Sequence, residues 1–336
     1  MSDFEVLSGL RDHDWAAHDS AAAHRRLAAA RPPASLADHA AGARAYRPDE
    51  DLGRAVNAAI HLRAPLLVTG EPGTGKTQLG YFLGLYFDIA VFPYTVRSTS
   101  TARDLRYDFD AVAYLREAYL AGSGGGAAGA GRDAPARGDP NQDPRMRHIE
   151  PGPLWRAFTH RAPCLVLIDE IDKAPRDFPN DLLQELDQQE FPHPFSERPE
   201  HAVRADRDRR PLVLVTSNNE RRLPDAFLRR CIVHHIAMDE ALIGRAVAAH
   251  AGAYPALDLA ARAAAVARFR ELRGLDRLSR KPGIAELLAW LVTLDRALPG
   301  LAERDLMAKP LRDLPYLDCL VKDQGDQGIL REPGRR

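Results

Sequence analysis

The sequence predicts an α/β fold, with a parallel sheet between helices, followed by a region of helices alone. Short apolar runs lie at 65–69, 163–168 and 211–216. The second run is continuous, which is typical of a strand buried on both faces of a parallel sheet. Segments with apolar residues at helical spacing separate the runs, and the chain from 238 to 299 is rich in Ala and Leu at the same spacing.

The order of the elements follows from these patterns, because helices and strands bury apolar residues with different periods. Helices are expected at 21–30, 52–60, 79–86, 111–120, 154–160, 181–189, 223–231, 246–253, 257–272 and 284–294, and strands at 65–69, 90–96, 163–168, 211–216 and 232–236. In the helix at 79–86, the expected buried face is Leu79, Phe82, Leu83 and Tyr86.

Composition divides the chain into four parts. Residues 1–45 are rich in Ala, Arg, His and Asp, and a solvated helix packed loosely on the body is favoured there over a partner-binding arm. Residues 46–237 are expected to form the α/β domain and 238–320 a helical domain. Residues 321–336 are expected to be a polar, frayed tail.

An insert near 121–147 interrupts the α/β domain. It is rich in Gly, Ala, Pro and Asp. Such a composition buries too little apolar surface to offset the loss of chain entropy, so a mobile loop is expected. The apolar runs resume after it, and the insert therefore does not end the domain.

The stretch from Gly70 to Thr77 reads GEPGTGKT and matches the phosphate-binding pattern G-x-x-x-x-G-K-[ST], the P-loop. It lies between a predicted strand and a predicted helix, and a chance match in a chain of this length is expected about 1% of the time. Glycines allow backbone N–H groups to turn towards phosphates, which Lys76 can reach while the Thr77 hydroxyl binds Mg²⁺. The candidate ATP-binding residues are Gly70, Glu71, Pro72, Gly73, Thr74, Gly75, Lys76, Thr77 and Gln78.

Two acidic residues, Asp169 and Glu170, follow the apolar run at 163–168. The carboxyl end of such a strand is the edge of an α/β sheet where ligands bind. Asp169 is the candidate ligand for a Mg²⁺ that bridges the β- and γ-phosphates. Glu170 is placed to orient and polarise the attacking water. Downstream of a P-loop, this pair predicts nucleotide hydrolysis.

Three further positions leave alternatives open. Asn218, at the end of a predicted strand, either positions water or is an ordinary turn residue, with equal weight. Arg229 and Arg230 fit a surface pair better than an arginine that stabilises phosphate charge in a neighbouring subunit. Arg280 and Lys281 precede a helix whose dipole they oppose, so they either face an anion or are exposed on a loop.

Composition argues against several classes of protein. The chain has 336 residues, 45% of them apolar, with 46 basic and 47 acidic residues. A nucleic-acid-binding protein usually carries a basic excess. For the Pro-rich segment at 193–210, whose arginines gather at 204–210, a solvated hairpin with compensated charge is favoured over a contact for substrate, partner or nucleic acid. Three cysteines fit no zinc pattern and are expected to be buried thiols in a reducing compartment.

Because no apolar run spans a membrane and no signal-peptide core begins the chain, a cytoplasmic protein is expected.

Together these residues resemble those of the AAA+ ATPases, and most closely the MoxR-type branch, over roughly 46–296. Besides the P-loop, the likeness is carried by the segments PGPL, DEIDKAP, LLQEL, TSNNE and LPDAFLRRC, at 151–154, 169–175, 182–186, 216–220 and 223–231. The resemblance implies a five-stranded parallel sheet, a helical lid, and Mg²⁺-dependent hydrolysis of ATP to ADP and phosphate.

The resemblance also implies roles for single residues. Lys76 and Thr77 correspond to the Walker A lysine and threonine, and Asp169 and Glu170 correspond to the Walker B pair. Asn218 corresponds to sensor 1, and Arg230, rather than Arg229, corresponds to the arginine finger. Arg280 or Lys281 corresponds to sensor 2.

Members of this family form rings, commonly hexamers, that act like chaperones by remodelling or maturing a protein partner. Partners with a von Willebrand factor A domain are frequent in the MoxR-type branch. Two alternatives are a nucleic-acid-directed motor and a nucleotide-gated scaffold with little turnover. The near-neutral charge argues against the first, and the intact Glu170 argues against the second.

Overall fold

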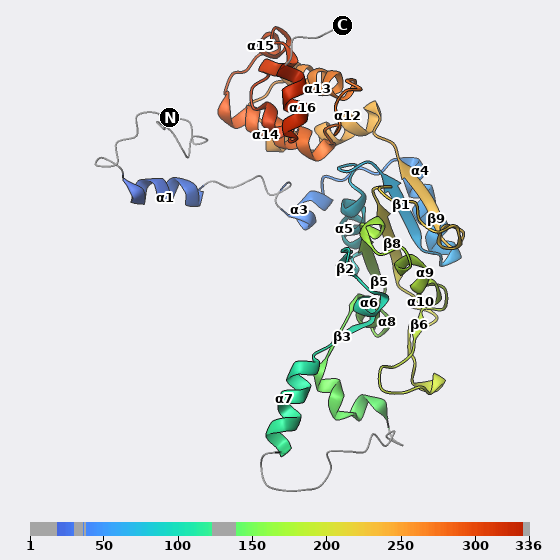
Figure 1. Cartoon of the computed structure of the whole chain (residues 1–336). Coiled ribbons are helices and arrows are strands. Elements are labelled where there is room, and N and C mark those ends of the chain that lie inside the picture. The colour runs from blue at the N-terminus through green and yellow to red at the C-terminus, as the bar shows by residue number, and fades with distance from the viewer. Residues whose placement is uncertain (1–18, 30–35, 37, 123–138, 332–336) are drawn as a thin grey trace. The chain divides into compact units, whose positions relative to one another are not determined.

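A computed structural model describes residues 19–29, 36, 38–122 and 139–331 of the chain (Figure 1). The chain divides into two compact units. The α/β unit comprises 48–70 and 79–236, and the helical unit comprises 71–78, the chain from 237 onwards and the described residues before 48. The loop at 71–78 therefore packs with the helical unit, although it lies inside the segment predicted as the α/β domain.

The core of the α/β unit is a five-stranded parallel sheet, as predicted, with the strand order β2-β5-β8-β1-β9 (Figure 1). The strands are β1 (Leu66–Gly70), β2 (Ala90–Thr95), β5 (Cys164–Asp169), β8 (Leu212–Ser217) and β9 (Ile232–Ile236). Ile168 of β5 lies beside Val215 of β8, and Thr69 of β1 lies beside Ser217. The carboxyl ends of these strands therefore meet at one edge of the sheet, where β1 leads into the P-loop.

Helices in the α/β unit connect the strands. They are α4 (Glu50–Leu62), α5 (Lys76–Phe87, whose first turn belongs to the P-loop), α6 (Ala102–Arg106), α7 (Ala111–Gly122), α8 (Pro153–Phe158), α9 (Phe178–Asp181), α10 (Leu183–Gln188) and α11 (Asp225–Leu228). The sequence determines these ends locally. For example, the Asp49 carboxylate accepts a 2.8 Å hydrogen bond from the Leu52 N–H at the start of α4.

Helices cover both faces of the sheet. Successive strand residues point to opposite faces. Val166 and Val215 belong to the main apolar cluster, together with Phe158 of α8. On the other face, α5 approaches so closely at Gly80 that a Cβ atom there would lie 3.0 Å from the Leu167 side chain.

The buried face of α5 differs from the prediction at its end. Leu79 and Leu83 are buried as predicted, but Tyr86 is 70% exposed. Gly84 faces the sheet instead, and a Cβ atom there would lie 2.4 Å from the Val91 side chain. Because glycines rather than aromatic rings face the sheet, the helix lies close to it and the Tyr86 ring points to solvent.

A small antiparallel pair of strands, β3 (Tyr107–Phe109) and β4 (Ile149–Pro151), flanks the segment that contains the predicted mobile insert. Residues 123–138 of the insert lie outside the described residues. Its last part is ordered, contrary to the prediction, because the carboxylates of Asp139 and Asp143 cap two short 3₁₀ turns, Pro140–Gln142 and Pro144–His148. A second antiparallel pair, β6 (Glu190–Phe191) with β7 (Val203–Arg204), closes a hairpin that overlaps the segment predicted as one, and most of the arginine-rich stretch at 204–210 follows this hairpin.

The helical unit has its own apolar core around Phe269, Trp290 and Leu291, which are fully buried. It contains α1 (Ser20–Ala29), α3 (His39–Ala43), α12 (Glu240–Ala249), α13 (Leu259–Arg273), α14 (Ile284–Ala297), α15 (Glu303–Met307) and α16 (Gln324–Arg331). The prediction for 246–253 is shifted, because α12 ends at Ala249 and a 3₁₀ turn follows at Ala251–Ala253.

The prediction of a polar, frayed tail at 321–336 is wrong for most of that segment. Gln324–Arg331 form α16, and Leu330 is buried in the core of the helical unit. The Asp326 carboxylate accepts hydrogen bonds from the backbone N–H groups of Ser279 and Arg280, at 2.8 and 3.0 Å. These bonds attach α16 to the loop that leads into α14. Residues 332–336 lie outside the described residues.

None of the described helices is both long enough and apolar enough to cross a membrane.

Candidate functional site

The P-loop turns through left-handed backbone conformations at two of its glycines. Gly73 has a φ of 80° and Gly75 a φ of 88°, which side chains with a Cβ atom rarely adopt. A Cβ atom at Gly75 would also lie 2.9 Å from the Tyr46 ring. Gly75, a glycine that the motif specifies, is therefore required both by its backbone and by the space around it, and Gly73, at a variable position of the motif, is required by its backbone.

The P-loop closes on its own lysine. The Lys76 ammonium group is buried and donates a 2.8 Å hydrogen bond to the Glu71 carbonyl oxygen. The Thr74 hydroxyl donates to the same oxygen at 2.9 Å. A single backbone carbonyl therefore fixes a buried cation and a hydroxyl on the inner side of the loop.

Residues of the helical unit surround the P-loop. A Cβ atom at Gly283, just before α14, would lie 2.7 Å from the Pro72 carbonyl oxygen. Gln78 exchanges hydrogen bonds with His39, donating at 2.6 Å to its carbonyl oxygen and contacting its ring nitrogen at 3.3 Å. The loop is thus held between α14 and the segment that contains α3.

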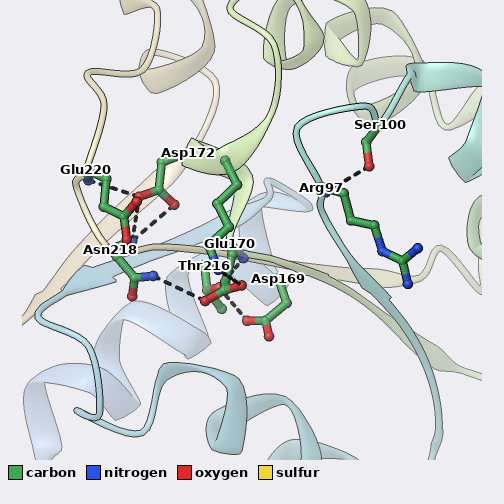
Figure 2. A network of polar contacts seen from close by, with 9 residues as sticks. Arg97, Ser100, Asp169, Glu170, Asp172, Thr216, Asn218 and Glu220 are labelled. Atoms are coloured by element: carbon green, nitrogen blue, oxygen red, sulfur yellow. Dashed lines mark hydrogen bonds and ion pairs between the residues drawn. The ribbon is translucent and has the colours of Figure 1, made fainter. Parts of the chain in front are cut away.

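The predicted Mg²⁺ ligand, Asp169, lies in a polar network at the carboxyl edge of the sheet (Figure 2). Its Oδ1 atom accepts a 2.6 Å hydrogen bond from the Thr216 hydroxyl of β8. The Thr216 oxygen in turn accepts the Glu170 N–H at 2.9 Å. This threonine therefore joins the ends of β5 and β8 and fixes both acidic residues.

The Glu170 carboxylate is held by two side chains. Its Oε1 atom accepts a 3.3 Å hydrogen bond from the Asn218 side-chain amide, and its Oε2 atom lies 2.5 Å from the Lys173 ammonium group. The structure thus brings together Asp169, Glu170 and Asn218, the three residues predicted at the strand ends (Figure 2). The carboxylate of Glu170 holds the pKa of Lys173 above its ordinary value.

Glu170 has a φ of 61°, in the left-handed region that non-glycine residues seldom occupy. Such backbone conformations persist where the surroundings enforce them, and they concentrate at functional sites. Here the Thr216 hydroxyl and Asn218 hold the residue from β8. The conformation sets the direction in which the Glu170 carboxylate leaves the strand.

Sequence reasoning missed Asp172, which organises the turn after β8. It is 3% exposed, and its carboxylate accepts the backbone N–H groups of Asn218, at 3.1 and 3.2 Å, and of Glu220, at 3.0 Å (Figure 2). These bonds hold a turn in which Asn219 is left-handed, with a φ of 60°. The sequence signals are a second aspartate three positions after Asp169 and its place in the DEIDKAP segment, neither of which indicates this role.

The two candidate finger arginines differ in their contacts. The Arg230 guanidinium pairs with the Asp187 carboxylate of α10 at 2.5 Å and donates to the Ala226 carbonyl oxygen at 3.1 Å. Arg229 is exposed and forms no ion pair within the described residues. Both follow α11 on the surface of the α/β unit.

The candidate sensor residues of the helical unit are largely exposed. The Arg280 side chain is 65% exposed and lies 3.8 Å from Glu286. The Lys281 side chain is 42% exposed and lies 3.7 Å from Asp276. A different arginine, Arg273 at the end of α13, contacts the P-loop through an ion pair of 2.8 Å with the Glu71 carboxylate.

Of the three cysteines predicted to be buried, only Cys164 is buried, and Cys231 and Cys319 are half-buried. Cys164 is buried in β5, and burial raises its pKa to about 11. Burial, with the nearby Asp187 carboxylate, raises the pKa of Cys231 to about 12. All three cysteines are free thiols, and the described residues contain no cluster of His, Cys, Asp and Glu suited to a metal ion. His235 packs structurally, with its ring nitrogen 3.0 Å from the Thr69 hydroxyl oxygen.

Comparisons with known proteins give likenesses at the level of structure only. No family model and no curated protein sequence matches the chain. NtrX of Brucella abortus, solved with ADP, is 14% identical, with a TM-score of 0.44, over 84% of this chain and 57% of the NtrX chain. A proposed ATPase of Cytophaga hutchinsonii is 12% identical, with a TM-score of 0.38, over 89% of this chain and 93% of its own.

Proposed function

We propose that the protein is a Mg²⁺-dependent ATPase of the AAA+ class, similar to its MoxR-type branch. The observation that carries this proposal is the network of Asp169, Glu170, Thr216 and Asn218 at the edge of the sheet where β1 leads into the P-loop. An acidic pair at the end of a buried strand does not by itself indicate catalysis. In a chain that also has a phosphate-binding loop, such a pair has the chemistry needed to hydrolyse a nucleoside triphosphate.

The P-loop would bind the phosphates of ATP. Left-handed glycines turn its backbone N–H groups inward, and Lys76 supplies a positive charge that is already buried on the inner side of the loop. That charge would lie against the β- and γ-phosphates. The proposed binding residues remain the run from Gly70 to Gln78, with Arg280 or Lys281 from the helical unit.

Thr77 and Asp169 would hold Mg²⁺. Hydroxyl and carboxylate oxygens suit this hard cation, which prefers oxygen ligands in an octahedral arrangement. The Thr216 hydroxyl fixes the Asp169 carboxylate in one orientation, as a metal ligand requires. When bound, the cation would neutralise charge on the phosphates.

Glu170 would act on water. Its carboxylate would orient a water molecule for attack on the γ-phosphate and accept a proton from it, leaving ADP and inorganic phosphate. Asn218 and Lys173 hold the two carboxylate oxygens in place, and Asn218 would in addition sense the γ-phosphate. The position of Asn218 itself depends on Asp172.

We further propose that the active form is a ring, with six subunits as the expected number. Arg230, or Arg229, would then reach the phosphates of a neighbouring subunit, where a guanidinium stabilises the charge of the transition state. The ring would remodel or mature a protein partner, for which a von Willebrand factor A domain protein is the first candidate. Analytical ultracentrifugation with and without ATP tests the assembly, and a protein that stays monomeric in both would contradict it.

A nucleic-acid-directed motor is the less favoured alternative. In the arginine-rich segment at 204–210, Arg204 pairs with Glu190 and Arg209 pairs with Asp206. These ion pairs compensate the charge of two of the four arginines in the segment. The intact Glu170 network likewise favours turnover over a scaffold that only binds nucleotide.

Steady-state hydrolysis by the wild type and by Glu170→Gln tests the proposed function. The amide of the variant keeps the shape of the side chain but cannot accept the proton. We expect phosphate release to fall at least ~100-fold while ATP still binds, since general-base catalysis contributes about 10²–10⁴-fold. Equal rates in both proteins would contradict the assignment of Glu170.

A further inference from the structure

Arg273 is the last residue of α13, and its side chain is only 13% exposed. One guanidinium nitrogen lies 2.8 Å from the Glu71 carboxylate, and the other donates a 2.6 Å hydrogen bond to the Pro282 carbonyl oxygen. A single planar group therefore bridges the P-loop and the loop that leads into α14. Arginine suits such a position, because its fork of donors can hold two acceptors in fixed directions.

Glu71 connects this bridge to Lys76. While its side chain pairs with Arg273, its backbone carbonyl accepts the Lys76 ammonium group at 2.8 Å and the Thr74 hydroxyl at 2.9 Å. A shift of Glu71 therefore displaces the acceptor that fixes the buried lysine. The chain of contacts runs from Arg273 through Glu71 to Lys76, all within the helical unit.

The P-loop and the loop before α14 are closely packed around this bridge. A Cβ atom at Gly73 would lie 3.3 Å from the Ile284 backbone nitrogen, and one at Gly283 would lie 2.7 Å from the Pro72 carbonyl oxygen. The two loops joined by Arg273 are therefore in direct backbone contact. Because nothing larger than glycine fits between them, a movement of α14 must be transmitted to the P-loop.

Other basic residues nearby lack this contact. Arg280 and Lys281 point to acidic residues of the helical unit itself. Arg277, four residues after Arg273, is exposed and forms no ion pair in the described part of the chain. Arg273 thus differs from its neighbours both in burial and in what it contacts.

We propose that Arg273 is a positioning residue that holds the P-loop in the conformation that binds nucleotide, and so couples the helical unit to the phosphate site. This inference rests on the proposed function, because it assumes that Lys76 binds phosphate. It assigns Arg273 no contact with the nucleotide. Its effect on binding passes through Glu71.

A double-mutant cycle on the full-length chain tests the inference. The variants are Arg273→Gln, Glu71→Gln and their combination, with Arg277→Gln as the matched control. The measurement is the Kd of a fluorescent ATP analogue in the presence of Mg²⁺, with a melting curve of each free protein as a check of folding. Binding, rather than turnover, is measured because the loop conformation acts before the chemical step.

We expect each single variant to weaken binding by about 10-fold, within the range usual for coupled sites. The double variant should be no weaker than the worse of the two, because both remove the same ion pair. Arg277→Gln should bind as the wild type does. If Arg273→Gln fails to fold, Glu71→Gln decides, because it leaves the bond from Arg273 to Pro282 intact.

Three results would contradict the inference, in distinguishable ways. Wild-type affinity in Glu71→Gln, or losses that multiply in the double variant, would refute the coupling through Glu71 while leaving the proposed function in place. Absence of saturable binding by the wild type itself would refute the proposed function, and the inference with it.

Discussion

Replacing Asp172 with Asn should loosen the turn that holds Asn218. The carboxylate is 3% exposed and receives two backbone N–H groups, from Asn218 and from Glu220. An asparagine keeps one acceptor oxygen but turns an NH₂ group towards a second N–H donor. One charged hydrogen bond is then lost and a buried donor is left without a partner, which costs roughly 2–3 kcal/mol.

Hydrogen exchange measured by mass spectrometry on peptides covering 212–220 gives the local effect. At tenfold per 1.4 kcal/mol, the estimated loss corresponds to exchange about 30- to 150-fold faster at these amides. The hydrolysis rate should fall as well, because a catalytic group displaced by 1 Å can cost about 100-fold. Nucleotide affinity should change little, since the P-loop does not depend on Asp172.

Asp177→Asn is the matched control. Asp177 is exposed, precedes α9 and makes no side-chain capping bond. This variant should exchange and hydrolyse as the wild type does. Unchanged exchange at 212–220 in Asp172→Asn, or an equal change in the control, would refute the role given to the buried carboxylate.

Two further predictions follow from single contacts. Hydrogen bonds from the Ser279 backbone, and then from Arg280, hold the pKa of Asp326 below its ordinary value, which is near 3.9. The folding stability that this carboxylate provides is therefore complete at a pH above the ordinary pKa. It is lost as the pH falls through the lowered pKa. Acid titrations of the melting temperature should show this loss in the wild type and not in Asp326→Asn, and identical curves would contradict it. Arg230→Ala should lose hydrolysis but not ATP binding. Mixing it with Glu170→Gln should restore part of the activity, because in a shared site one variant supplies the arginine and the other supplies the glutamate. A wild-type rate in Arg230→Ala alone would exclude a site shared through this residue.

The strand ends could be predicted from the sequence because short-range patterns determine them. Asp169 and Asn218 each follow a continuous apolar run, and parallel strands bring such ends to one edge. In the structure, hydrogen bonds join Asn218 to Glu170 and, through Thr216, Asp169 to Glu170 at that edge. Gly75 could be predicted for a similar reason, because the motif itself specifies a glycine at that turn.

Contacts between distant segments could not be predicted in the same way. Asp172 binds the backbone of residues 46 and 48 positions away, and Arg273 pairs with a glutamate 202 positions away. Neither residue stands out in its own segment, because a lone Asp or Arg is usual on a protein surface. Only the fold shows that each is largely buried and what it contacts.

The errors in the fold have similar causes. Tyr86 continues an apolar stripe along α5, but Gly80 and Gly84 set the face that approaches the sheet. The tail is polar overall, and α16 is held by few contacts, among them those of Leu330 and Asp326. Patterns of hydrophobicity show how many apolar residues a segment has, whereas the buried face of α5 and the packing of α16 depend on single close contacts.

Hydrolysis of ATP per subunit, measured against protein concentration for the wild type and Glu170→Gln, is the decisive measurement. We expect a wild-type rate that requires Mg²⁺ and rises cooperatively with concentration, because assembly completes the site. In the variant, we expect a rate near zero at every concentration. A wild type that binds ATP but releases no phosphate, or a variant as active as the wild type, would contradict this expectation.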